Sequence, residues 1–166
     1  MTNAEALAIA AAILHREGLL LDRKDWDAWL ALYREDVEYW VPAWLDEYQT
    51  TNDPDTQVSQ IYHSARRELQ ERVDRIRSRK SITAMPLPRT THSIANLLVA
   101  GASEEAIDVT ASWTTHVYDT TSAKQYVLFG LHEVGLRPDA DGWRIARKKT
   151  ILMNDRVPTA LDFYHL

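Results

Sequence analysis

The six histidines of this 166-residue chain are its clearest candidates for chemistry, and they are scattered along it. No two of them stand four residues apart, the spacing at which one helix face presents a pair of metal ligands. The chain has no cysteine, which excludes cysteine-ligated clusters, a cysteine nucleophile and structural disulfides. A mononuclear iron site needs two histidines and a carboxylate that converge. We therefore expect no metal and no cofactor in this chain.

Proton transfer is the chemistry that the remaining side chains would suit. A pair of titratable groups in an apolar cavity can act as acid and base. The candidates for such a pocket are Asp36, His116 and His132. His132 lies on an apolar strand face, where a hydrogen-bonded core histidine is the common alternative. Asp36 follows two charged residues at a predicted helix end, where a turn role is also expected.

The elements that would position these groups change character halfway along the chain. No repeat or linker divides it, so we predict a single domain over residues 1–166. Apolar spacing predicts helices over about 4–21, capped by Asn3, and over about 26–33 and 64–77. Predicted strands occupy about 37–41, 58–62, 90–100, 106–118, 124–137 and 143–154.

Helices followed by a run of long strands indicate an α+β fold. Tight turns between the last four strands predict an antiparallel sheet that is strongly curved, with Gly130 and Gly135 as sites of bulges or bends. The strand over 106–118 alternates between an apolar face and a polar face with little charge. The apolar face would pack on the helices. The polar face suits either a partner protein or water.

The charge distribution favours a protein partner over nucleic acid. The net charge is −5, yet eight basic residues stand against three acids between Tyr62 and His92. A basic patch on an acidic protein suits an acidic protein surface, although a solvated helix face has the same pattern. The six tryptophans are numerous for this length and suit an interface as well as a core. The start of the chain does not look like a signal peptide and no apolar run is long enough for a membrane span, so we expect a cytoplasmic protein.

Several short segments resemble one known family when taken in order. They are Asp25–Leu30, Tyr39–Trp44, Ile61–Arg66, Glu71–Ile76, Arg89–Asn96 and Gly142–Lys148. In this order and spacing they are similar to the beta subunits of the benzoate, toluate and anthranilate dioxygenases, across residues 19 to 157.

The resemblance implies a fold, a partner and a role. The fold would be a cystatin-like or nuclear-transport-factor-like cone, with the N-terminal helices packed on the curved sheet. The partner would be a dioxygenase alpha subunit that carries a Rieske [2Fe–2S] cluster and a mononuclear iron and receives electrons from a reductase. Three alpha and three beta subunits would form a hexamer for the cis-dihydroxylation of an aromatic acid. The beta subunit would support assembly, without catalytic residues, and in some members it influences substrate preference.

The resemblance also implies which residues would contact the partner subunit. Aromatic anchors and forked arginine donors are the side-chain types that dominate interface energy. The proposed contacts are Tyr39, Trp40, Pro42, Trp44, Arg66, Arg72, Arg75, Arg89, His92 and Asn96.

A different function remains open from the residues alone. A cone of this kind can also be a stand-alone isomerase, dehydratase or cyclase, with Asp36, His116 and His132 in its pocket. A pure ligand-binding module is a third alternative.

Overall fold

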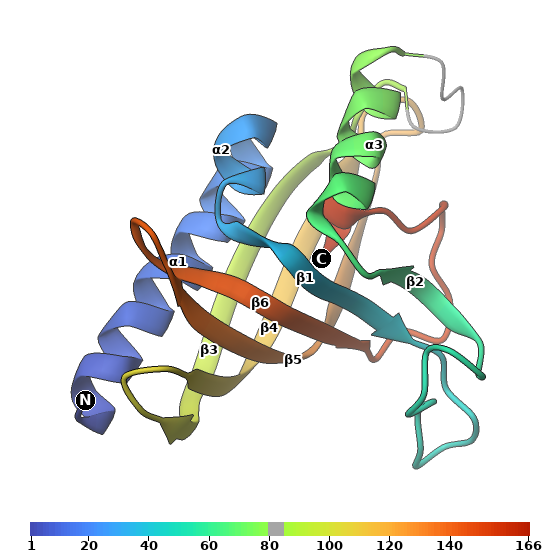
Figure 1. The fold of residues 1–166 in the computed structure, drawn as a ribbon. Helices are drawn as coiled ribbons and strands as arrows, with labels where there is room; N and C mark the ends of the chain where they lie inside the picture. Colours follow the sequence, from blue (N-terminus) through green and yellow to red (C-terminus); the bar gives the residue numbers. More distant parts are fainter. Residues whose placement is uncertain (80–84) are drawn as a thin grey trace.

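The computed structural model describes residues 1–79 and 85–166; Lys80 of the predicted basic segment lies outside them. Its helices are α1 (Asn3–Arg23), α2 (Trp26–Leu30), α3 (Arg66–Arg77) and a short 3-10 helix, η2 (Phe163–His165). Its strands are β1 (Tyr33–Pro42), β2 (Ser59–His63), β3 (Arg89–Ala102), β4 (Ile107–Asp119), β5 (Lys124–Asp139) and β6 (Gly142–Leu152). The predicted α+β fold is confirmed (Figure 1).

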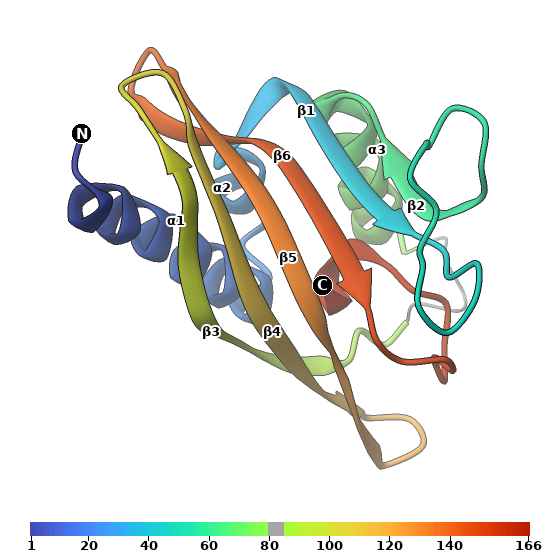
Figure 2. The same ribbon diagram turned by 90° about the horizontal axis from the view of Figure 1, so that it is seen from below.

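The strands form one curved six-stranded sheet in the order β2-β1-β6-β5-β4-β3. The predicted antiparallel meander is confirmed from β3 to β6. One neighbouring pair is different: β1 runs parallel to β6, which the strand pattern did not predict. Figure 2 shows the twist of the sheet and the helices on one side of it.

Helix α1 lies along β3 and begins one residue earlier than predicted. Its N-cap is Thr2 rather than Asn3, because the Thr2 hydroxyl accepts from the Glu5 N–H and the Glu5 carboxylate accepts from the Thr2 N–H. This capping box satisfies two otherwise unpaired donors at the helix end. Gly18 lets the helix approach the sheet closely, since a Cβ there would lie 3.0 Å from the Cβ of His92.

The predicted helix over 26–33 is too long. Helix α2 ends at Leu30 and β1 starts at Tyr33. The chain joins the sheet beside β6 at this point, because the Ile145 N–H donates to the Leu32 carbonyl at 2.8 Å. Asp36 therefore lies within a strand, and not at a helix end as predicted.

One of the two predicted glycine irregularities is confirmed. The pairing of β5 with β6 shifts register between Gly135 and Leu136. Gly130, in contrast, lies in regular pairing with β4, so there is no bulge at this position; the alternative, a bend, stays a prediction. Glycine is needed at this position for a different reason, because a Cβ at Gly130 would overlap the main-chain carbonyl oxygen of Ile151.

An unpredicted bulge bends β3. Its pairing with β4 shifts register between Ala95 and Leu98, and Asn96 between them has φ of 52°. Asparagine is among the residues that tolerate this left-handed conformation best. Its side-chain amide donates to the Ser112 hydroxyl at 3.0 Å, which ties the bulge to the next strand.

The core lies between the concave face of the sheet and the helices. On β4 the predicted apolar face is buried: Ile107, Val109, Ala111, Trp113 and Val117 are all at most 3% exposed. Helix α3 buries Leu69, Val73 and Ile76 in the same core. Within residues 1–79 and 85–166, no helix combines the length and apolar character that crossing a bilayer requires.

Candidate functional site

A buried ion pair occupies the interior of the cone. Glu17 on α1 and Lys148 on β6 are 2% and 1% exposed, and Lys148 Nζ donates to Glu17 Oε1 at 2.6 Å. The Tyr33 hydroxyl donates to the same carboxylate oxygen, and the ring of Tyr39 lies beneath the ammonium group at 5.7 Å. Burial and the nearby Glu17 carboxylate raise the pKa of Tyr33 well above its ordinary value, so its hydroxyl remains a donor. Both charged groups of the ion pair therefore have their partners within the core.

A second polar pair links α1 to β3. The Asp22 carboxylate lies 2.6 Å from His92 Nδ1, and it also accepts from the His92 N–H and the Thr90 hydroxyl. Desolvation acts to raise the pKa of Asp22, but the hydrogen bonds from His92 outweigh it and the pKa is lowered. Asp22 therefore stays ionised and fixes the orientation of the His92 ring. Chemically this is an acid–histidine pair of the kind that general bases use.

His132, the third polar group, is held between a hydroxyl and an aromatic ring. Its Nδ1 lies 2.9 Å from the Thr150 hydroxyl, and its ring stacks on Trp113 with centroids 5.2 Å apart. Burial first, and then the charge of Lys148, lower the pKa of His132 well below its ordinary value. A neutral and stacked histidine of this kind matches the structural role considered for it above.

Residues 161–166 close the open end of the cone. Phe163 stacks on Trp29 with centroids 4.5 Å apart. Arg72 of α3 forms two hydrogen bonds with the Asp162 carboxylate, at 2.7 and 3.3 Å. Lys148 Nζ donates to the Leu166 carbonyl oxygen at 3.3 Å. The segment is thereby fixed by stacking, an ion pair and a buried hydrogen bond.

The enclosed interior therefore has no room for a substrate. The cavity between Glu17, His92, His132, Lys148 and Leu166 measures about 10 Å³. That is the space of about one water molecule, whereas small-molecule pockets usually exceed 300 Å³. The geometry gives the stand-alone enzyme less support than the subunit role.

The donor sets of the described residues do not fit iron. In the two described ranges, no group of three or more His, Asp or Glu side chains lies close enough together to hold a metal ion. A Rieske cluster also requires cysteines, and the chain has none. No reaction step is therefore assigned to iron in this chain.

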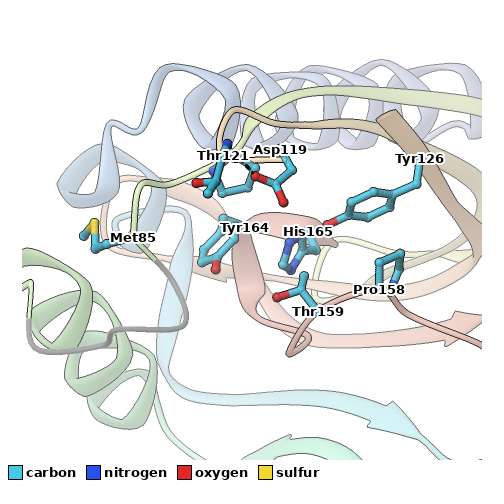
Figure 3. A pocket seen from close by; sticks show the side chains of 9 residues that line it. Met85, Asp119, Thr121, Tyr126, Pro158, Thr159, Tyr164 and His165 are labelled. Carbon is cyan, nitrogen blue, oxygen red and sulfur yellow. Dashed lines mark hydrogen bonds between the residues drawn. The ribbon is translucent and has the colours of Figure 1, made fainter. Parts of the chain in front are cut away.

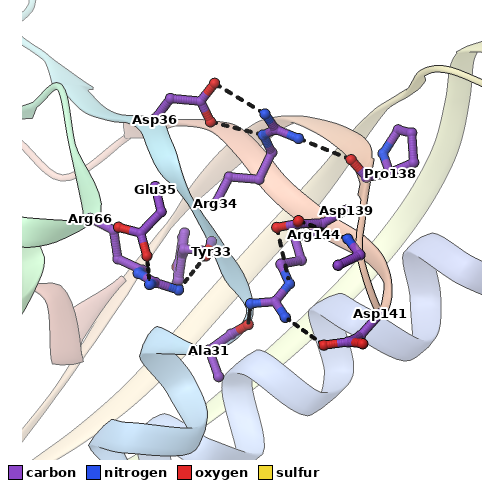
Figure 4. A network of polar contacts seen from close by, with 11 residues as sticks. Ala31, Tyr33, Arg34, Glu35, Asp36, Arg66, Pro138, Asp139, Asp141 and Arg144 are labelled. Carbon is purple, nitrogen blue, oxygen red and sulfur yellow. Dashed lines mark hydrogen bonds and ion pairs between the residues drawn. The ribbon is translucent and has the colours of Figure 1, made fainter.

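Two of the three predicted pocket residues lie on the surface. Figure 4 shows the Asp36 carboxylate paired with Arg34, whose guanidinium also donates to the Pro138 carbonyl. The hydrogen bond from Arg34 lowers the pKa of Asp36, which is an exposed ion-pair residue. His116 is exposed on the convex face of β4. Only His132 lies in the interior, so the structure does not bring the predicted trio together.

The predicted aromatic anchors lie mostly inside the fold. Tyr39 is 1% exposed and Trp40 is 5% exposed, and Pro42 is buried. The Trp40 indole donates to the Ser59 hydroxyl at 2.8 Å, which ties β1 to β2. Trp44 is partly buried and donates to the Leu152 carbonyl at 2.7 Å. As folded, these side chains fix the edge of the sheet, and Trp44 has the most surface left for a partner.

The predicted arginine contacts divide into two groups. Arg66 pairs with Glu35 and donates to the Tyr33 carbonyl (Figure 4), and Arg72 holds Asp162. Their guanidinium groups are therefore engaged within the chain. Arg75 and Arg89 are exposed and available to a partner.

The two polar residues predicted on one face of β3 play different roles. The His92 side chain is 5% exposed and is held by Asp22, whereas Asn96 is exposed at the bulge. The bulge changes the alternation of the strand after Ala95, so residues four apart no longer share a face. Asn96 remains a predicted contact residue.

Sequence reasoning missed Glu17, Asp22 and Lys148. Glu17 follows Ala6, Ala10 and Leu14 at helical spacing, so a charged residue on the buried stripe was the available signal. The partner of Glu17 is 131 residues away in sequence, and nothing local identifies it.

The convex face of the sheet carries an exposed apolar patch. Phe129 and Leu131 on β5 are 47% and 42% exposed, and Leu98 on β3 is 67% exposed. Thr114, Ser112 and Thr110 lie opposite them on β4. We call these three apolar residues and Met153, which is 37% exposed, the convex patch. Exposed clusters of this kind commonly mark interaction surfaces.

Comparison with known proteins assigns the family. Residues 16–159 match the model of the family described as ring hydroxylating beta subunit. The chain is 39% identical to the anthranilate 1,2-dioxygenase small subunit of Acinetobacter baylyi, covering 92% of this chain and 93% of that protein. It is 36% identical to the 2-halobenzoate 1,2-dioxygenase small subunit of Burkholderia cepacia, with both chains fully covered. The crystal structure of the benzoate 1,2-dioxygenase beta subunit of Burkholderia mallei superposes with a TM-score of 0.79 at 34% identity, over 96% of each chain. The chain therefore belongs to the beta subunits of the aromatic-ring-hydroxylating dioxygenases.

Proposed function

We propose that this chain is the non-catalytic beta subunit of a cytoplasmic dioxygenase that hydroxylates an aromatic acid of the benzoate or anthranilate type. Relatives that carry those substrate names are 33–39% identical over most of the chain, which supports an acid substrate. The oxidation would take place on an alpha subunit.

The observation that carries the proposal is the closed interior of the cone. A pocket enzyme needs enclosed space beside its acid–base groups, and here the interior cavity that His92 and His132 share measures about 10 Å³. A larger hollow beside His92, of about 300 Å³, is open to solvent between α1 and β3. The convex patch, in contrast, leaves apolar side chains in water unless a partner covers them.

In the proposed assembly, three alpha and three beta subunits form a hexamer. The alpha subunit would hold the Rieske [2Fe–2S] cluster and the mononuclear iron, and a reductase would supply its electrons. The beta subunits would contact their partners through the convex patch and through exposed predicted contacts such as Arg75, Arg89 and Asn96.

Co-expression with the dioxygenase alpha subunit of the same organism tests the proposal. We expect the two chains to co-purify in equal amounts and to show the absorption of a Rieske cluster, while this chain alone is colourless. Reduced benzoate or anthranilate turnover by the alpha subunit on its own would support the assembly role. Failure of the chains to associate, or turnover of an aromatic acid by this chain alone, would contradict it.

A further inference from the structure

Residues 161–166, which we call the plug, separate two spaces at the mouth of the cone. On the outside is a hollow of about 270 Å³, with Tyr164 of the plug and Thr159 before it in its wall (Figure 3). On the inside is the cavity of about 10 Å³ described above, with Leu166 in its wall. Withdrawal of the plug would therefore join the two spaces and open the interior of the cone to solvent.

The plug is attached to the fold by side chains and not through the sheet. Residues 153–160 before it form no helix or strand and are mostly exposed. In the part of the chain that the structure describes, no hydrogen bond between two main-chain groups joins residues 155–166 to another element. The main-chain hydrogen bonds of the plug are formed within it. The plug can therefore leave the cone without breaking a pair of strands.

An ion pair at the surface holds the plug against α3. The Asp162 carboxylate accepts two hydrogen bonds from Arg72, whose side chain is 33% exposed. The same carboxylate accepts from the Phe163 N–H at 2.9 Å, so it also caps the short helix η2. Segments held by few contacts open locally at a lower free energy than the core strands. We expect the plug to be such a segment.

Inside the cone, the plug occupies two positions that suit a ligand. The Phe163 ring stacks on Trp29 with centroids 4.5 Å apart, and the Lys148 ammonium donates to the main-chain oxygen of Leu166 at 3.3 Å. When the plug leaves, Trp29 loses this stacking partner and Lys148 loses one acceptor, although it keeps Glu17. An aromatic ring joined to an oxygen acceptor would restore both contacts.

We propose that the plug opens as a unit and exposes a site in the cone for a small compound that has one aromatic ring and an oxygen acceptor. The ring takes the position of Phe163 on Trp29. The oxygen takes the position of the Leu166 oxygen at Lys148. The site belongs to this chain alone and does not depend on the alpha subunit.

Hydrogen exchange of the ¹⁵N-labelled full chain, followed by NMR, tests the opening. Four amides of the plug donate hydrogen bonds within it, so their exchange reports how often these bonds break. We expect them to exchange at one common rate, at least about 100-fold faster than the slowest amides of β4 and β5.

Two arginine variants test what holds the plug. Arg72→Gln removes the ion pair with Asp162 and should accelerate exchange of the plug amides at least about threefold. Arg77→Gln removes an exposed ion pair with Asp27 from the same helix, and it should leave the plug amides unchanged.

The compound 3-phenylpropionamide tests the site behind the plug. Its ring and carbonyl oxygen are joined by a flexible link of two carbon atoms, as in a phenylalanine residue. A ligand that binds only the open form increases the population of that form, so about 10 mM of the compound should accelerate exchange of the plug amides at least about twofold. The amides of β4 and β5 should not change. Propionamide, which lacks the ring, should have no effect.

Three results would overturn the proposal. Exchange of the plug at the rate of the sheet would show that it opens only when the whole chain unfolds. Exchange that 3-phenylpropionamide leaves unchanged or slows would show that no such site lies behind the plug. Equal exchange in Arg72→Gln and Arg77→Gln would exclude the ion pair as the contact that holds it. The first two results come from the unchanged chain, so they decide the question even if a variant fails to fold. None of them bears on association with the alpha subunit, which the co-expression experiment measures separately.

Discussion

At the residue scale, the two carboxylates in the interior of the cone each have their hydrogen-bond donors within the chain. Glu17 accepts from Lys148 and Tyr33, and Asp22 accepts from His92 and Thr90. A buried ion pair adds little net stability over an apolar pair of similar volume, but loss of one partner leaves an uncompensated charge. The cost of substitution here therefore depends on whether one partner or both are removed.

Lys148→Met should destabilise the chain by about 3–5 kcal/mol, because it leaves the Glu17 carboxylate buried without a cation. The double variant Glu17→Gln with Lys148→Met should recover much of that loss. Urea unfolding measures both. Lys124→Met, at an exposed position, is the control and should change stability by less than about 0.5 kcal/mol. A double variant no more stable than Lys148→Met would contradict the interpretation of the ion pair.

His165 should make the chain less stable in mild acid. Its pKa falls from an ordinary 6.5 to about 4 on folding, mainly through burial. The unfolded chain then binds more protons between these values, so stability is full above pH 6.5 and falls as the pH drops toward 4. From pH 7 to pH 5 this histidine alone should contribute a loss of about 2 kcal/mol.

His165→Asn tests this origin of the acid sensitivity. Asparagine keeps an oxygen that can accept from the Asp162 N–H but does not titrate, so the loss between pH 7 and pH 5 should shrink by about that amount. Unfolding curves at the two pH values measure it. An unchanged pH dependence would assign the effect to other groups, such as His132, whose pKa is lowered in the same direction.

Sequence reasoning found His132 and missed its surroundings for a physical reason. Strand alternation places His132 on the inner face without knowledge of any other strand. Lys148, Glu17 and Asp22 acquire their roles only through contacts between elements far apart in the chain. The exposed ion pair of Asp36 with Arg34 depends likewise on β1, which begins at Tyr33 because β6 lies beside it.

At the element scale, the close approach of two backbones decides where a strand has space for a Cβ atom. The β5–β6 pair leaves no space for a Cβ at Gly130, whose neighbour across the strand gap is the Ile151 carbonyl. At Gly101 in β3 there is nothing within 4 Å of the place a Cβ would take. The two glycines are therefore unequal although both lie in long strands.

Gly130→Ala should destabilise the chain by about 3 kcal/mol, the upper range for overpacking, because main-chain atoms must move to admit the methyl group. Gly101→Ala is the matched control and should be neutral or slightly stabilising, since it only restricts the unfolded chain. Thermal unfolding of the two variants side by side gives the comparison. Equal effects would show that the strand gap at Gly130 accommodates a methyl group.

Much of the element order followed from the sequence alone. Period-two alternation and the turns between strands predicted the four-strand meander, and residues 66–77 lie within the predicted third helix. The parallel β1–β6 pair could not be predicted, because no local sequence pattern indicates which strands are neighbours in the sheet. The Asn96 bulge was also missed, since the residue looks like a polar position in an ordinary strand.

At the scale of the whole molecule, the two faces of the sheet differ in how far their side chains are covered. The concave face is covered by helices and by residues 161–166, which bury their side chains. The convex face keeps Phe129, Leu131 and Leu98 in contact with water. That asymmetry is expected of a subunit whose remaining surface is completed by another chain.

Phe129→Asp combined with Leu131→Asp should weaken association with the alpha subunit or between beta subunits by about 2 kcal/mol or more, the range of interface anchors. The fold should survive, since both side chains are partly exposed and lie outside the core cluster. Analytical ultracentrifugation and circular dichroism measure the two effects. Leu45→Asp, at a residue 58% exposed in a loop, is the control for adding charge at an apolar position. Unchanged assembly would exclude the convex patch as a contact surface.

The parallel pairing of β1 with β6 has a consequence for the order in which the chain can fold during synthesis. Tyr33 and Ile145 pair across about 110 residues of intervening chain. Until β6 leaves the ribosome, β1 has only the short strand β2 beside it, and the sheet cannot close around α1. Pairings between distant segments form slowly, and chains that wait for them expose apolar surface to other chains. The N-terminal half is therefore not a folding unit of its own, and the stability of the molecule depends on strands that are synthesised last.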